Sequence, residues 1–257
     1  RVVNVEMIML DDKGEPESNN ARYFYEQDII TIAPFKKSGI PMAINGGVIA
    51  HEYFHSVFER LFVKSYRSQS GGPPQQFEGL QFYNEIVLRS WNEGLADFYA
   101  YLYLQTADLF GNSVQYDVQM ARKLDLPVDR LSTADELQQD LSFQMQGPKC
   151  TSGFCVAYQE GSKISRFLYT IWNRLDTDEQ RWQFVQDLLI GLRKATESNF
   201  TASNTQQMDL RDLVPFIANQ KWVHDSKSCE FLLRLMGETE ILDQYSECSQ
   251  KSVEAAP

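Results

Sequence analysis

Apolar residues follow two different spacings along the chain, and the change between them divides it in two. Near the N-terminus, β-branched and aromatic residues form three short runs bounded by turn residues, as is typical of strands. These runs cover residues 2–10, 21–27 and 29–33. From Val48 to roughly Val63 the apolar residues recur at helical spacing, so this segment is predicted to form a helix.

Most of the remaining sequence has a helical pattern, after a loop rich in glycine and proline over residues 68–79. The helices are predicted over residues 81–109, 114–124, 133–146, 162–176, 178–198, 208–219, 229–236 and 240–248. We therefore expect an α+β fold in which residues 1–65 form a small mixed lobe with a short sheet, and residues 66–257 form a larger all-helical lobe. The helix over 48–63 ends the first lobe, and a cleft is expected between the two.

The charge of the chain excludes one class of function. The sequence has 24 lysine and arginine residues against 35 aspartate and glutamate residues, a net charge of −11. Nucleic-acid binding requires a basic face, which such a chain lacks over most of its surface. No segment approaches the ~18 apolar residues of a membrane helix. We expect no nucleic-acid partner, no transmembrane segment and a monomer.

The cysteines bear on the cellular compartment. The sequence begins with Arg1 and contains four cysteines, whose local spacing suggests the disulfides Cys150–Cys155 and Cys229–Cys248. Four cysteines permit three pairings, and four reduced buried thiols are the alternative. Because the sequence starts with arginine, we expect a processed or trimmed product, which leaves room for an earlier signal peptide, and we therefore expect an extracytoplasmic protein that is secreted, periplasmic or attached to a surface.

His51, Glu52 and His55 form an H-E-x-x-H motif on the helix predicted over 48–63. Residues four apart lie about 40° apart around a helix axis, so both imidazoles can reach one Zn²⁺ ion. Glu52 can then take a proton from a water that the metal polarises. Between Val48 and Phe58 the motif's glutamate is the only residue with a formal charge, which indicates a buried helix. The alternative is a helix with two hydrogen-bonded, partly buried histidines.

A zinc site of this kind needs a third protein ligand. The extended metzincin pattern requires glycine and histidine where the chain has Phe58 and Leu61, so that class is excluded. His224 lies far away in the helical lobe. Glu93 is the better candidate, because the 38 residues after the second histidine of the motif allow a loop and a returning helix.

Asp97 lies one helical turn after Glu93, on the same helix face. Glu93 can therefore bind the metal while Asp97 accepts a ring N–H from a ligating histidine, which fixes that ring's orientation. An ordinary acidic stripe on a solvated helix is the alternative. Trp91, Leu95 and Phe98 argue against it, because they predict a largely buried helix whose carboxylates need a cation or hydrogen bonds.

These residues resemble the gluzincin metallopeptidases, and among them the thermolysin-like group, which carry H-E-x-x-H on one helix and Glu-x-x-x-Asp on a later one. The resemblance implies a zincin-like fold and a single Zn²⁺ held by His51, His55 and Glu93. It also implies that Glu52 is the general base and that Asp97 orients His51. Calcium sites of the family are not carried over.

Two weaker resemblances concern the substrate. Members of the family bind the substrate backbone along an edge strand with an Asn-Ala-aromatic sequence, which Asn20 and Ala21 match and Arg22 does not. An oxyanion-stabilising histidine lies shortly before Ser-Gly and a helix, and in the segment 158–164 Tyr158 stands at that place. A structural tyrosine is the alternative, and His224 is the rival donor.

The sequence thus predicts a zinc-dependent peptidase, either an endopeptidase or an oligopeptidase, that acts on peptides or proteins. A catalytically silent zinc-binding or interaction domain with the same scaffold is the alternative, and the motif's intact glutamate argues against it. Another zinc hydrolase, such as an epoxide-opening enzyme, is a third possibility, which the predicted edge strand disfavours.

Overall fold

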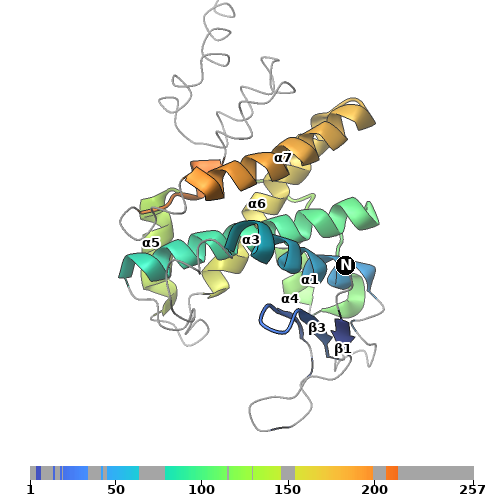
Figure 1. Ribbon diagram of the computed structural model, residues 1–257, viewed down its shortest axis with the longest axis horizontal. Coiled ribbons are helices and arrows are strands. Elements are labelled where there is room, and N and C mark those ends of the chain that lie inside the picture. The colour runs from blue at the N-terminus through green and yellow to red at the C-terminus, as the bar shows by residue number, and fades with distance from the viewer. Residues whose placement is uncertain are drawn as a thin grey trace, which may run out of the picture.

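A computed structural model shows a mostly helical protein with one small sheet (Figure 1). It describes residues 4–6, 14, 18, 20–33, 42, 45–63, 79–114, 116–128, 130–145, 154–198 and 207–213. The predicted α+β architecture is confirmed at this level, and the division into two lobes stays a prediction. No helix in these ranges is both long enough and apolar enough to cross a bilayer.

The sheet has three strands in the order β1-β3-β2. β1 (Asn4–Glu6) pairs in parallel with β3 (Ile29–Ile32), and β2 (Ala21–Phe24) pairs with β3 in antiparallel register. Asp28 adopts a positive φ of 58° in the turn between β2 and β3, where aspartate tolerates the left-handed conformation. β2 and β3 are shorter than their hydrophobic runs predict, and β3 is the most buried, as expected for the central strand.

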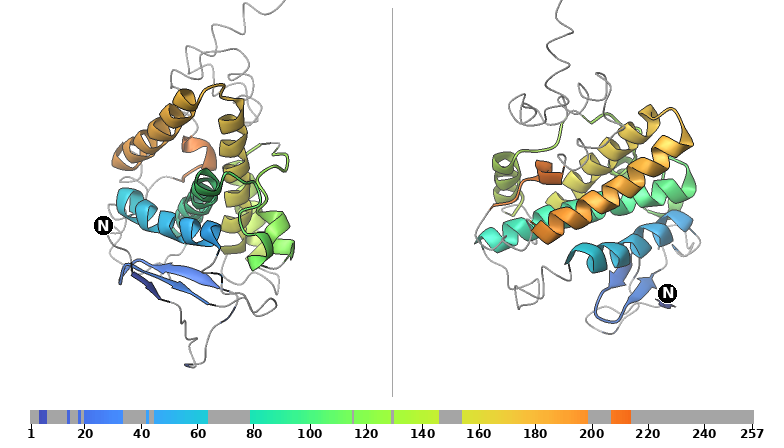
Figure 2. Two further views of the ribbon diagram at one scale, coloured as in Figure 1. Left: turned by 90° about the vertical axis from the view of Figure 1, so that its right-hand side faces the viewer. Right: turned by 45° about the horizontal axis from the view of Figure 1, so that its top comes forward.

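Helix α1 (Gly46–Phe58) lies between the sheet and helix α3 (Gly79–Leu104), as Figure 2 shows. Asn45 caps α1, because its Oδ1 accepts hydrogen bonds from the backbone N–H groups of Gly47 and Val48. The Asn45 amide also donates to the Phe110 carbonyl at 2.6 Å, which ties the start of α1 to the loop after α3. A π-helical turn continues the helix over Glu59–Val63, so the predicted end is correct.

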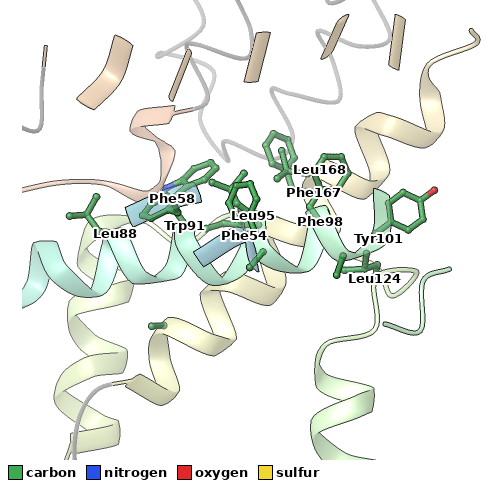
Figure 3. Packing of buried hydrophobic residues seen from close by; sticks show 14 of the residues in the cluster. Phe54, Phe58, Leu88, Trp91, Leu95, Phe98, Tyr101, Leu124, Phe167 and Leu168 are labelled. Atoms are coloured by element: carbon green, nitrogen blue, oxygen red, sulfur yellow. The ribbon is translucent and has the colours of Figure 1, made fainter. Parts of the chain in front are cut away.

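An apolar core joins α1, α3 and the later helices (Figure 3). Trp91 and Leu95 of α3 belong to this core together with Phe54 and Phe58 of α1. The indole of Trp91 donates to the carbonyl of Leu210 at 3.0 Å, so its one polar atom is satisfied inside the core. This packing buries the helix faces that carry the sequence motifs.

Within the described ranges, four further α-helices follow α3. They are α4 (Tyr116–Ala121), α5 (Ala134–Met145), α6 (Phe154–Arg174) and α7 (Asp178–Ser198). The predicted bounds of α7 are correct, whereas α6 begins eight residues before the predicted start. Of the helix predicted over residues 208–219, the structure describes residues 208–213, which include a 3₁₀ turn over Leu210–Leu213. The helices predicted over 229–236 and 240–248 lie outside the described residues.

Capping boxes begin two of these helices. At α5, the backbone N–H of Thr133 donates to Glu136, and the Thr133 hydroxyl accepts from the Glu136 backbone. Thr177 and Gln180 make the same reciprocal pair at the start of α7. Each pair satisfies backbone donors that a helix leaves open, so these starts are determined locally by the sequence.

Helices α3 and α6 approach each other most closely at two glycines. A Cβ atom added at Gly94 would lie 2.7 Å from the Gly161 carbonyl oxygen and 2.7 Å from Cβ of Ile164. One added at Gly161 would lie 2.7 Å from Cβ of Glu93. Glycine inside a helix costs about 1 kcal/mol relative to alanine. Here it permits a crossing that no larger residue allows, directly beside Glu93.

We expect Gly94→Ala to destabilise the protein by roughly 1–3 kcal/mol, because the new methyl group forces α3 and α6 apart. Urea unfolding followed by circular dichroism measures this change. Gly46→Ala is the matched control, since its Cβ would be crowded by the Tyr103 ring at 3.1 Å and would meet Leu104 at an ordinary 3.5 Å, and Tyr103 is 68% exposed and can move. Equal stability of the two variants would contradict the close crossing.

Candidate metal centre

Helix α1 brings the two histidines of the motif together. His51 and His55 are one helical turn apart, and their Nε2 atoms are 3.0 Å from each other. The rings are nearly perpendicular, with an interplanar angle of 85° and centroids 4.5 Å apart. His51 is buried and His55 is partly buried. Two ring nitrogens thus point at a common position on one side of α1.

Helix α3 supplies a carboxylate to the same position. Glu93 Oε2 lies 3.3 Å from His51 Nε2, and Glu93 Oε1 lies 3.7 Å from His55 Nε2. In a tetrahedral zinc site with bonds near 2.0–2.1 Å, neighbouring ligand atoms are about 3.3 Å apart. The separations of 3.0, 3.3 and 3.7 Å between these three groups bracket this value. The structure therefore brings the three predicted ligands together.

Each of the two histidines is oriented through its second ring nitrogen, Nδ1. His51 Nδ1 lies 3.0 Å from Asp97 Oδ1, as the sequence predicts. His55 Nδ1 lies 2.9 Å from Asn92 Oδ1. An acceptor at Nδ1 holds the proton on that nitrogen and leaves Nε2 free to bind a cation. Sequence reasoning missed Asn92, although its position directly before Glu93 is the signal that could have found it.

Glu52 is also buried in this cluster, with 6% of its surface exposed. One of its carboxylate oxygens and one nitrogen from each motif histidine all lie within 4.8 Å of one another. A buried carboxylate at this distance can accept a proton from a water held between the histidines. The structure therefore places Glu52 beside both imidazoles, and its role as the general base stays a prediction.

Arg122 joins the cluster, and the sequence gives no signal for it. Its Nε donates to Asp97 Oδ2 at 2.9 Å, and its Nη2 donates to Asp97 Oδ1 at 2.6 Å. The same Nη2 donates to Glu93 Oε2 at 3.1 Å. Arg122 follows the short helix α4, and only the tertiary fold brings that segment next to α3.

The charges of the cluster shift its pKa values. Burial and the nearby Arg122 guanidinium both lower the pKa of His51, but hydrogen bonds to Asp97 and Glu93 outweigh them and raise it to about 9. Burial raises the pKa of Glu93, and the positive charges of His55, His51 and Arg122 outweigh this effect and hold it well below its usual range. The ionised carboxylate of Glu93 is therefore strongly favoured.

Tyr158 lies close to the cluster from a third helix, α6. Its ring centroid is 5.6 Å from the Arg122 guanidinium carbon. The negative charge of Glu93 and burial raise the pKa of Tyr158 above its usual value, so the phenol keeps its proton. The residue is nevertheless 48% exposed, so a ligand can reach it. The sequence placed it before a helix, which is wrong, because α6 begins four residues earlier.

The predicted substrate strand packs against α1, the helix that carries the two histidines. Ala21 is the first residue of β2, which is an edge of the described sheet and packs against α1. Asn20 directly precedes β2, and its carbonyl accepts a hydrogen bond from the Ala33 N–H at 2.8 Å. The role of this strand in binding a substrate stays a prediction.

Not every predicted residue lies in the described part of the chain. His224, the rival donor, lies outside the described residues, as do Cys150, Cys229 and Cys248. Cys155 is described and does not carry a free thiol. Both disulfide pairings therefore stay predictions.

We expect the protein measured with a chelator present to lose stability as the pH rises from about 6.5 to about 9. The folded state raises the pKa of His51, so its stabilising proton is fully bound below the unfolded value of 6.5 and is lost as the pH passes 9. The loss is roughly 3 kcal/mol. Urea midpoints across this range measure it, and His51→Gln serves as the control that removes the slope. A wild-type midpoint that does not change with pH would contradict the raised pKa.

Comparison of the chain with protein families, with curated proteins and with solved structures finds no match. The resemblance to gluzincins therefore rests on the motif residues of α1 and α3. The cluster His51, Glu52 and His55 is a group of side chains that could hold a metal ion.

Proposed function

We propose that this protein is a zinc-dependent peptidase. The observation that carries the proposal is the convergence of His51 Nε2, His55 Nε2 and the Glu93 carboxylate, whose separations of 3.0–3.7 Å match the spacing of zinc ligands. Two imidazoles and one carboxylate form the donor set of catalytic zinc sites, which keep a fourth position open.

The formal charges of the cluster also suit a divalent cation. Glu52, Glu93 and Asp97 contribute three negative charges, and Arg122 contributes one positive charge, which leaves a net charge of −2 before the histidines are counted. The side chains of Glu93, Asp97 and Arg122 are 16%, 1% and 13% exposed, so water screens these charges weakly. One divalent ion balances this charge, and buried charge without compensation is costly.

The chemistry divides between the ion and the chain. His51, His55 and Glu93 would hold the zinc ion, which would supply a lowered pKa of water and polarisation of a carbonyl oxygen. Glu52 accepts the proton of the attacking water and passes it to the leaving amine. The phenol of Tyr158 keeps its proton at neutral pH, so it can donate a hydrogen bond to the developing oxyanion.

The sheet edge favours a peptide as substrate over other molecules that a zinc hydrolase opens. β2 pairs with β3 on one side and is the edge of the described sheet next to α1. An edge strand offers backbone N–H and C=O groups in the pattern that an extended peptide requires. Peptide hydrolysis measured with and without a chelator separates a peptidase from a silent zinc-binding domain.

We expect Glu52→Gln to keep zinc but to lower kcat for a fluorogenic peptide by about 10² or more, because glutamine cannot accept the proton. Zinc content by atomic absorption and initial rates measure the two effects. Glu59→Gln is the matched control, since it makes the same change one residue after α1 ends. Wild-type turnover in Glu52→Gln would refute the role of the general base.

We expect Glu93→Ala to weaken zinc binding by about tenfold or more, because it removes one of three protein ligands. Competition with a chromophoric chelator measures the affinity. Glu179→Ala, an exposed change near the start of α7, controls for the loss of one negative charge. Unchanged affinity of Glu93→Ala would show that another residue is the third ligand.

A further inference from the structure

Arg122 shares its guanidinium between two acidic residues of the metal centre. Its Nη2 atom donates to Asp97 Oδ1 at 2.6 Å and to Glu93 Oε2 at 3.1 Å. Glu93 Oε2 is also the oxygen that lies 3.3 Å from His51 Nε2. Arg122 Nη2 is itself 3.4 Å from His51 Nε2. The side chain therefore places a positive charge next to the atoms that a metal ion would use.

Contacts on several sides hold Arg122 in this position. Arg166 of α6 donates from Nη2 to the Ala121 carbonyl at 2.7 Å and from Nε to the Lys123 carbonyl at 2.9 Å. It therefore binds the backbone on both sides of Arg122. The Phe110 ring centroid lies 4.9 Å from the guanidinium carbon, at a distance that permits a cation–π contact. The Arg122 side chain is 13% exposed, so it has little freedom to turn into solvent.

Two opposite consequences follow from these contacts. Through Asp97, Arg122 helps to orient His51, which favours metal binding. Through Glu93, it engages a ligand oxygen and adds a positive charge beside the site, which opposes metal binding. Like charges repel more strongly in a buried site than in water. We expect the repulsion to be the larger effect, because Arg122 Nη2 lies 3.1 Å from Glu93 Oε2 and 3.4 Å from His51 Nε2, the atoms that a metal ion would bind.

We propose that Arg122 is an internal cation that competes with the metal ion for Glu93, and so keeps the affinity of the centre for metal below what its ligands alone would give. This proposal rests on the metal centre of the proposed function. Metal binding then requires Arg122 to give up Glu93 Oε2 while it keeps its two hydrogen bonds to Asp97. The guanidinium balances part of the buried carboxylate charge until the metal ion replaces it.

The test is the zinc affinity of Arg122→Met, which removes the charge and keeps much of the side-chain volume. We expect its Kd for Zn²⁺, measured by competition with a chromophoric chelator, to fall by about tenfold or more relative to wild type. Arg122→Lys keeps the charge, so its affinity stays closer to wild type. Arg130→Met removes a charge from the pair with Glu136 at an exposed position and controls for net charge, so its Kd should not change.

An unchanged or weaker affinity in folded Arg122→Met would overturn the proposal, because a purely supporting role for Arg122 gives that result. Circular dichroism of the metal-free variant establishes that it is folded. A second measurement needs only the wild-type fold. The ¹⁵N guanidinium resonance of Arg122, assigned by its loss in Arg122→Lys, should shift during zinc titration with the same midpoint as binding. A resonance that does not move would overturn the proposal as well.

The results also separate this proposal from the proposed function. If wild type binds zinc and Arg122→Met binds it no more tightly, the metal centre stands and the competition is refuted. If wild type binds no measurable zinc and Arg122→Met does, the competition is supported, because removing the arginine then allows zinc to bind. If neither protein binds zinc, both the competition and the metal centre are refuted.

Discussion

The centre of this protein depends on the balance of charge between two packed helices. α1 carries Glu52, and α3 carries Glu93 and Asp97, in a region from which water is largely excluded. Three carboxylates in such a place repel one another unless cations offset them. Arg122 supplies one positive charge, and the pKa of His51 rises to about 9, so this ring can supply a second. The same requirement for positive charge makes the cluster a suitable site for a divalent ion.

The packing of three helices positions the residues of this centre. α3 lies between α1 and α6, and its close crossing with α6 at Gly94 and Gly161 is directly beside Glu93. The same α6 carries Tyr158 and, through Arg166, holds the segment that ends in Arg122. Displacing α6 would therefore move the predicted oxyanion donor and the internal cation together. For this reason a packing change at Gly94 is expected to affect the centre as well as stability.

Local sequence patterns predicted much of the fold and of the site. A clear helical period gave α7 with its observed bounds, and the structure shows that a capping box of neighbouring residues begins this helix. The spacing of His51 and His55 gave their common direction, because helical geometry fixes it. Other boundaries were less accurate. The prediction started α6 after Gly161, although this glycine lies inside the helix, where the crossing with α3 requires it.

The sequence by itself determined which chemistry is available: two imidazoles on one helical turn, a glutamate between them, and an acidic pair one turn apart on a later helix. These are short-range relations, which the geometry of a single helix dictates. Tertiary structure alone decided that the two helices face each other, with ligand atoms 3.0–3.7 Å apart. It alone also brought Arg122 to Asp97 across 25 residues, because such a contact depends on how the whole core packs.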